Sequence, residues 1–188
     1  TAMTKDVRHN LAAPVHAQAL LAPNRPAVVA EDETLSYGEL IDRSRRIAAL
    51  LQAHGLGPGR RVGILGSRSV IAVEAVLAAA WIGATYVPLG LRWPPARFAA
   101  VLERLRLDAL VADRSGTACL PHDCPALPQL VLLPAGSDRN ALPASNDVEA
   151  IALDTLPNAD RLGAPVAVEP DTLAYIIFTS GTTGVPKG

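Results

Sequence analysis

The chain has 188 residues, 49% hydrophobic and 19% charged, which is the balance of a packed domain and excludes a disordered tail. Seventeen basic and eighteen acidic residues give a net charge of −1, so no broad basic field exists to attract nucleic acid or anionic lipid. We therefore expect one domain, or most of one, and no nucleic-acid partner.

The first ten residues are polar and lack the apolar stretch of a secretory signal. We interpret residues 1–10 as a tag or linker and expect a cytoplasmic protein. A short helix over Val15–Ala22 and a strand over Ala27–Ala30 come next, followed by a turn at Glu31–Glu33.

The next segment predicts a well-defined helix. Ser36 and Glu39 have the spacing of a capping box, in which the hydroxyl and the carboxylate each accept from the other's backbone N–H. A glycine-rich stretch, Gly55–Gly59, should end this helix. Its apolar face carries Leu40, Ile47, Ala48 and Leu51.

Strands and helices then alternate with short links, which implies parallel pairing and right-handed crossovers. We therefore predict an α/β fold of layered, parallel-rich sheets with flanking helices. The expected elements are a strand at Arg61–Gly66, a helix at Val70–Trp81, a strand at Thr85–Val87, a helix from Pro94 to about Leu107 and a strand at Ala109–Ala112.

One apolar run, Val70–Leu91, is long enough to cross a bilayer. Gly83, Thr85 and Pro88 interrupt it where a soluble protein would turn from a helix into a strand. We therefore predict a buried helix followed by a strand, and no membrane partner.

Asp113–Pro170 is rich in Pro, Asp and Asn and contains one apolar strand, Leu130–Leu133. We interpret it as surface elaboration. Two cysteines, Cys119 and Cys124, flank His122, but three ligands fall short of a zinc site, so we expect no metal there.

The last apolar segment, Leu173–Phe178, is nearly continuous and predicts a strand buried on both faces. It runs directly into Thr179–Gly188, in which three glycines, four hydroxyls and one lysine occupy ten residues. Glycines let backbone N–H groups turn toward a ligand, and hydroxyls and an ammonium complete a cradle for phosphate oxygens. A flexible turn is the alternative interpretation. A Walker loop is disfavoured because Pro186 stands where its second glycine belongs and Gly188 follows Lys187.

The segment Tyr175–Gly188 (YIIFTSGTTGVPKG) resembles the phosphate-loop motif of adenylate-forming enzymes. Leu35–Leu40 (LSYGEL) and Gly83–Leu89 (GATYVPL) are similar to two early motifs of the adenylation domains of nonribosomal peptide synthetases. Gly90 departs from this pattern, because most such domains carry Asp there, and many have Tyr where Phe178 stands. By this resemblance, residues 11–188 are the N-terminal part of the large subdomain of an adenylation domain, truncated in the phosphate loop.

The resemblance also implies a reaction. An amino acid or aryl acid attacks Mg²⁺-bound ATP, and the acyl-adenylate passes to the phosphopantetheine thiol of a carrier protein domain. The residues expected to bind the ATP phosphates are Thr179, Ser180, Gly181, Thr182, Thr183, Gly184 and Lys187. No catalytic or metal-binding residue is expected in this segment, since the family's other functional residues lie in the remainder of the domain.

Two alternatives remain open from the sequence. A stand-alone acyl-CoA or acyl-AMP ligase would share the same segment and differ downstream. A non-catalytic structural lobe could instead support a partner surface through its alanine-rich helices.

Overall fold

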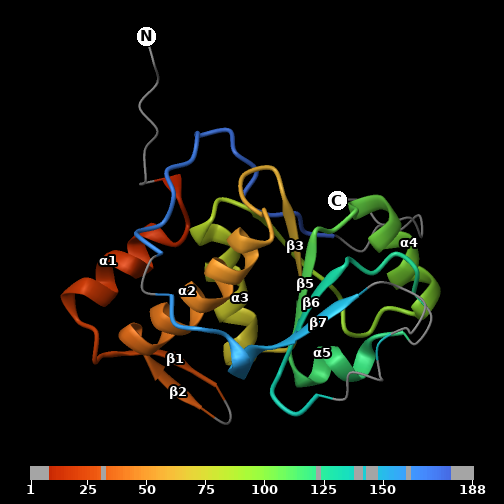
Figure 1. Cartoon of the computed structure of the whole chain (residues 1–188), viewed down its shortest axis with the longest axis horizontal. Helices are drawn as coiled ribbons and strands as arrows, with labels where there is room; N and C mark the ends of the chain where they lie inside the picture. The colour runs from red at the N-terminus through yellow and green to blue at the C-terminus, as the bar shows by residue number, and fades with distance from the viewer. Residues whose placement is uncertain are drawn as a thin grey trace.

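The structure is a computed structural model, and it describes residues 9–30, 33–121, 124–137, 142, 148–159 and 162–178. A parallel sheet of order β4-β3-β5-β6-β7 runs through its middle, and an antiparallel pair, β1-β2, lies beside the helices (Figure 1). The predicted α/β fold is confirmed. The elements are α1 (Ala13–Leu21), β1 (Pro26–Val29), β2 (Thr34–Ser36), α2 (Tyr37–Ala53), β3 (Arg61–Leu65), α3 (Val70–Trp81), β4 (Thr85–Pro88), α4 (Pro95–Leu105), β5 (Ala109–Ala112), α5 (Arg114–Cys119), β6 (Leu130–Leu133), β7 (Glu149–Ala152) and the 3-10 turn Leu153–Thr155.

The parallel sheet buries both of its faces, because successive side chains of each strand point to opposite cores. Val62 and Ile64 of β3 face a core shared with α2 and α3. On the other face, Leu110 of β5 and Val131 of β6 face a core shared with α4. Every residue of β5 and β6 is buried, which explains why these two strands are apolar throughout.

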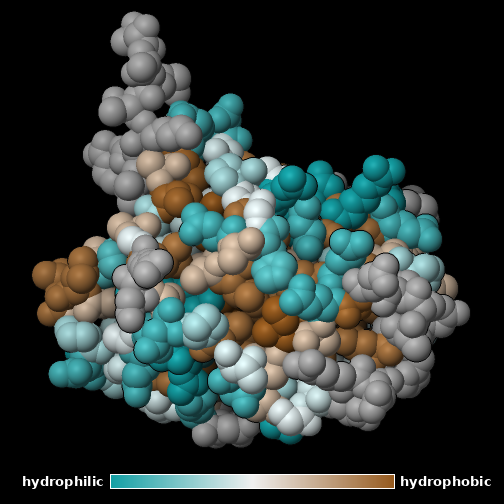
Figure 2. All heavy atoms as spheres, viewed as in Figure 1, coloured by the Kyte–Doolittle hydropathy of each residue, from teal (hydrophilic) through white to brown (hydrophobic). Residues whose placement is uncertain are grey.

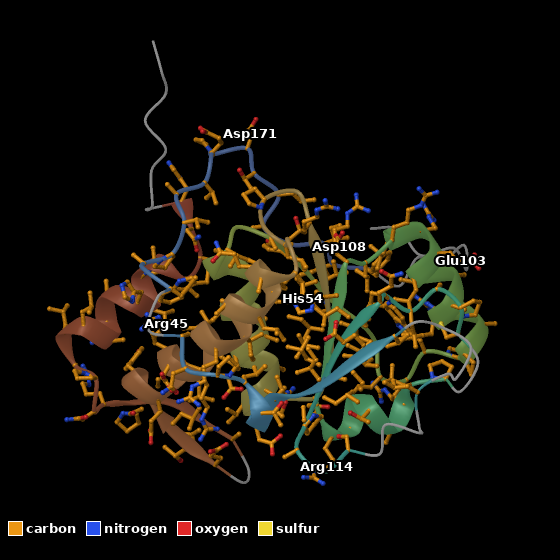
Figure 3. All side chains as sticks on the ribbon, in the orientation of Figure 1. Arg45, His54, Glu103, Asp108, Arg114 and Asp171 are labelled. Atoms are coloured by element: carbon orange, nitrogen blue, oxygen red, sulfur yellow. The ribbon has the colours of Figure 1, made fainter. Side chains whose placement is uncertain are left out.

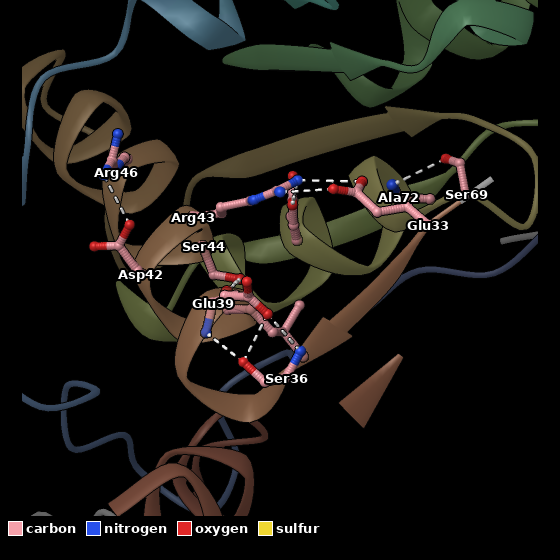
Figure 4. Close-up of polar contacts among 11 residues, drawn as sticks. Glu33, Ser36, Glu39, Asp42, Arg43, Ser44, Arg46, Ser69 and Ala72 are labelled. Carbon is pink, nitrogen blue, oxygen red and sulfur yellow. Dashed lines mark hydrogen bonds and ion pairs between the residues drawn. The ribbon is translucent and has the colours of Figure 1, made fainter. Parts of the chain in front are cut away.

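The capping box of α2 is confirmed (Figure 4). The Ser36 hydroxyl accepts from the Glu39 backbone N–H at 3.3 Å, and the Ser36 N–H donates to the Glu39 carboxylate at 2.8 Å. The helix ends where predicted. Gly55 has a positive φ of 77°, and the next N–H, that of Leu56, returns to the Leu51 carbonyl at 3.0 Å, as in a glycine-terminated helix.

Helix α3 has the predicted bounds and lies between α2 and the sheet. Ala75, Ala78 and Ala79 are fully buried, and their small side chains allow close packing on both sides of the helix. Within the described part of the chain, no helix is long and apolar enough to cross a membrane. The interpretation of Val70–Leu91 as a buried helix followed by a strand is therefore confirmed.

Asn10 was expected to lie in a tag or linker, yet its side chain is buried. Its amide nitrogen donates to the carbonyls of Ala80 (2.7 Å) and Val166 (2.9 Å), and its amide oxygen accepts from Ala12 N–H at 2.8 Å. Asn10 thereby fixes the start of α1 against the end of α3. At the other end of α1, apolar side chains reach the surface (Figure 2).

Asp113–Pro170 contains more structure than the one strand predicted. Asp113 caps α5 by accepting from Gly116 N–H at 2.7 Å. Strand β7 pairs in parallel with β6 and forms an edge of the sheet. Arg45 of α2 then reaches the following segment and donates to the carbonyls of Ala159 (2.9 Å) and Leu162 (Figure 3). The interpretation as surface elaboration alone was therefore wrong, because part of this segment completes the sheet.

The prediction that Leu173–Phe178 is buried on both faces was also wrong. Leu173, Tyr175 and Ile177 are 54%, 48% and 56% exposed, whereas the residues that alternate with them are half-buried. The segment joins the sheet through a single parallel bridge between Tyr175 and Tyr86 of β4. Because only one edge and one face of the segment meet other described residues, the other face of this apolar run is exposed.

Candidate functional site: the approach to the phosphate loop

The residues predicted to bind phosphate lie outside the described part of the chain. The structure describes the segment that leads to them and ends at Phe178. Within the described part of the chain, the site consists of the residues that position Phe178. The predicted phosphate-binding residues are Thr179, Ser180, Gly181, Thr182, Thr183, Gly184 and Lys187.

The approach segment, Leu173–Phe178, runs parallel to β4 and is joined to it by one bridge between Tyr175 and Tyr86. Tyr86 N–H donates to the Ala174 carbonyl, and Ile176 N–H donates to the Tyr86 carbonyl, each at 3.1 Å. The Thr85 hydroxyl donates to the Leu173 carbonyl at 2.8 Å. Parallel pairing places the end of the segment at the carboxyl edge of the sheet, where ligands of open α/β sheets bind. Phe178 therefore lies at that edge.

Three side chains form a stack at the end of the segment. The rings of Phe178 and Trp93 meet edge to face, with centroids 5.8 Å apart and planes at 89°. The Arg97 guanidinium carbon lies 5.2 Å from the centroid of the Trp93 ring. Trp93 belongs to the connection between β4 and α4. Its backbone N–H donates to the Gly90 carbonyl at 3.2 Å. This stack was not predictable from the sequence, in which the glycine at position 90 was its only signal.

A cavity of about 400 Å³ lies at the carboxyl ends of β5, β6 and β7. Glu74 of α3 lines it and is 4% exposed, and Arg43 of α2 approaches that carboxylate at 3.6 Å. Arg43 itself forms a shorter ion pair of 2.6 Å with Glu33 (Figure 4). Burial raises the pKa of Glu74 to about 7, against the opposing effect of the Arg43 charge. Glu74 is the one charged residue in the otherwise apolar sequence of α3. This charge in an apolar helix was visible in the sequence.

Protein stability should depend on pH through Glu74. The unfolded carboxyl titrates near 4.5 and the folded one near 7, so the folded state binds more protons between these values. The free energy of unfolding should therefore fall by about 3 kcal/mol as the pH rises through this window. Urea unfolding of the full-length protein, with local hydrogen exchange of α3, measures this change. Glu74→Gln should abolish it.

The matched control for this prediction is Glu103→Gln, at an exposed position on α4 (Figure 3). This control variant should keep the pH dependence of the unsubstituted protein. An unchanged slope in Glu74→Gln would contradict the assignment of the titration to Glu74.

The described residues offer no metal centre. Among them, no group of three or more His, Cys, Asp or Glu side chains could hold an ion. Cys119 is exposed and Cys124 is buried, and neither forms a disulfide among the described residues. His122, between them, lies outside the described residues.

The sequence matches the model of a family described as AMP-binding enzyme over residues 15–188. Novobiocin biosynthesis protein H of Streptomyces niveus is 39% identical over 170 residues, which are 88% of this chain and 26% of that protein. Phenyloxazoline synthase MbtB of Mycolicibacterium paratuberculosis is 36% identical over 171 residues, which are 91% of this chain and 13% of that protein.

A solved structure, that of IdnL7, superposes with a TM-score of 0.74 at 31% sequence identity. The superposition covers 92% of this chain and 33% of IdnL7. The chain therefore spans a third or less of each of these three proteins.

Proposed function

The chain belongs to the AMP-binding enzyme family, and we propose that it is the N-terminal part of an adenylation domain. This domain uses ATP to activate an amino acid or aryl acid. A carboxylate oxygen of the acid forms a bond to the α-phosphorus, the bond to the β-phosphate oxygen breaks, and pyrophosphate leaves. The phosphopantetheine thiol of a carrier protein in a cytoplasmic assembly line then forms a bond to the acyl carbon, the bond from that carbon to the phosphate oxygen breaks, and AMP leaves.

The observation that carries this proposal is the path of the chain into the loop. Hydrogen bonds from Thr85 and Tyr86 hold the approach segment along β4, and the segment ends at the carboxyl edge of the sheet. The loop residues 179–188 begin there, with the donor set that polyphosphate requires. The similarity to proteins of natural-product biosynthesis supports an amino acid or aryl acid as substrate.

The loop residues act on the leaving group. Hydroxyls of Thr179, Ser180, Thr182 and Thr183 donate to β- and γ-phosphate oxygens. Backbone N–H groups at Gly181 and Gly184 approach the phosphates because no Cβ intervenes. The Lys187 ammonium neutralises charge that develops on the departing pyrophosphate.

Mg²⁺, when bound with ATP, neutralises phosphate charge and orients the nucleotide. The described residues contain no acidic cluster that could hold this ion. The residues that bind Mg²⁺, like those that bind the acid, belong to the remainder of the adenylation domain.

Acid-dependent exchange of labelled pyrophosphate into ATP tests the proposed function in the full-length enzyme. We expect exchange with at least one amino acid or aryl acid. Transfer of the product to coenzyme A, and not to a carrier protein, would identify a stand-alone acyl-CoA ligase. An enzyme that is inert with every acid, yet hydrolyses ATP, would contradict the proposal.

Lys187→Ala should slow this reaction without removing it. One charge-assisted contact to phosphate contributes about 1.5–3 kcal/mol, which corresponds to roughly a 10- to 150-fold loss in kcat/KM for ATP. Steady-state exchange kinetics with varied ATP measure the loss. Lys187→Arg, which keeps the charge, should retain most of the activity. Unchanged kinetics in Lys187→Ala would show that the lysine does not contact the nucleotide.

A further inference from the structure

We propose that Trp93 is a positioning residue for the phosphate loop, acting through Phe178. This inference rests on the proposed function for its kinetic consequence, but its structural consequence can be measured independently. It concerns the stack of Phe178, Trp93 and Arg97 at the carboxyl edge of the sheet.

Backbone hydrogen bonds to β4 hold the approach segment only as far as Ile176, before the loop begins. Among the described residues, the last backbone hydrogen bond between this segment and β4 joins Ile176 N–H to the Tyr86 carbonyl. Phe178 lies beyond that bond and is held by its ring, which packs into the core shared with α4. The edge-to-face contact with Trp93 has the favourable geometry for an aromatic pair. The position of Phe178, and thus the start of the loop, depends on the Trp93 indole.

The indole is itself fixed from two further directions. The Arg97 guanidinium lies over the ring at 5.2 Å, an arrangement in which the cation is attracted by the aromatic face. On the Gly90 side, a Cβ atom at that position would lie 2.3 Å from the indole Nε1. Such a contact is too short to exist, so a side chain at position 90 would displace Trp93. The observed position of the Trp93 indole therefore requires glycine at position 90.

Loss of the indole should misplace the first residues of the loop relative to the sheet. A displacement of about 1 Å can cost roughly 100-fold in rate when reacting groups must be held in line. We expect Trp93→Ala to lower kcat/KM for ATP by about 10- to 100-fold. The KM for the acid should change little, because in the proposed function the acid is held by the remainder of the domain.

The experiment uses the full-length enzyme with Trp93→Ala, Trp93→Phe, Phe178→Ala and the double variant Trp93→Ala/Phe178→Ala. Exchange of the Ile176, Ile177 and Phe178 amides, measured without nucleotide by hydrogen–deuterium exchange, should accelerate in Trp93→Ala and recover in Trp93→Phe. Kinetically, the double variant should lose no more than the larger single loss, because both residues act through one contact. Gly90→Asp should reproduce Trp93→Ala.

The outcomes are separable. Unchanged amide exchange in folded Trp93→Ala, judged by an unchanged melting temperature, would overturn the inference whatever the enzyme's activity. Additive kinetic losses in the double variant would also overturn it, since Trp93 would then act independently of Phe178. Accelerated amide exchange in an enzyme that activates no acid would uphold the positioning role and contradict the proposed function.

Discussion

Residues 1–188 expressed alone should form no acyl-adenylate, whereas the full-length enzyme should do so. The described residues provide a scaffold and an approach to the loop, and in the proposed function the loop binds only the phosphate end of the nucleotide. Adenylation requires the acid carboxylate to be held in line with the α-phosphate. Losing that positioning forfeits on the order of 7–11 kcal/mol of the barrier reduction. No arrangement of Thr179 to Lys187 can replace a second reactant site.

Pyrophosphate exchange with a broad panel of acids, together with calorimetry of ATP binding, measures this loss. The control is the full-length enzyme prepared and assayed in the same way. Micromolar ATP affinity combined with acid-dependent exchange in residues 1–188 would contradict the prediction. It would mean that the active site is built mainly from residues that we interpret as scaffold.

The regular part of the fold was predictable because its signals are local. Helix α3, strand β5 and strand β6 have the predicted bounds. A long apolar run predicts a buried helix, and a short apolar run bounded by turns predicts a buried strand. The capping box of α2 was also predictable from the sequence, because Ser36 and Glu39 interact within one helical turn.

The parts that sequence reasoning missed depend on partners far along the chain. Strand β2 has only three residues, and β7 begins with an exposed Glu149 and lacks the fully buried apolar run of β5 and β6. Each forms a strand because a neighbour pairs with it. Leu173–Phe178 was misinterpreted because an apolar run does not reveal which of its faces is covered. The contact between the rings of Trp93 and Phe178 was not predictable, because no spacing rule connects residues so far apart in the sequence.

Trp81 joins three segments that are distant in sequence. It is fully buried, and its ring meets that of His16 from α1 edge to face at 4.9 Å. Its indole N–H donates to the Gly163 carbonyl at 3.1 Å, and its own carbonyl accepts from Val166 N–H at 2.9 Å. The pKa of His16 is lowered by burial beside this ring, and further by the nearby Arg45 charge. Trp81 therefore holds α1 and residues 162–168 against the end of α3.

Trp81→Ala should lower the free energy of unfolding by about 3–5 kcal/mol, because a cavity replaces the largest fully buried side chain. Trp81→Phe keeps most of the packing and leaves the Gly163 carbonyl without its donor, so it should cost about 1–3 kcal/mol. Urea unfolding of the full-length enzyme, with hydrogen exchange of the α1 and α3 amides, measures both losses. The matched control is Leu20→Ala, at a position of α1 that is 73% exposed, where we expect a change within about 0.5 kcal/mol. Equal losses in Trp81→Phe and Trp81→Ala would show that the hydrogen bond to Gly163, and not the buried volume of the indole, holds these segments together.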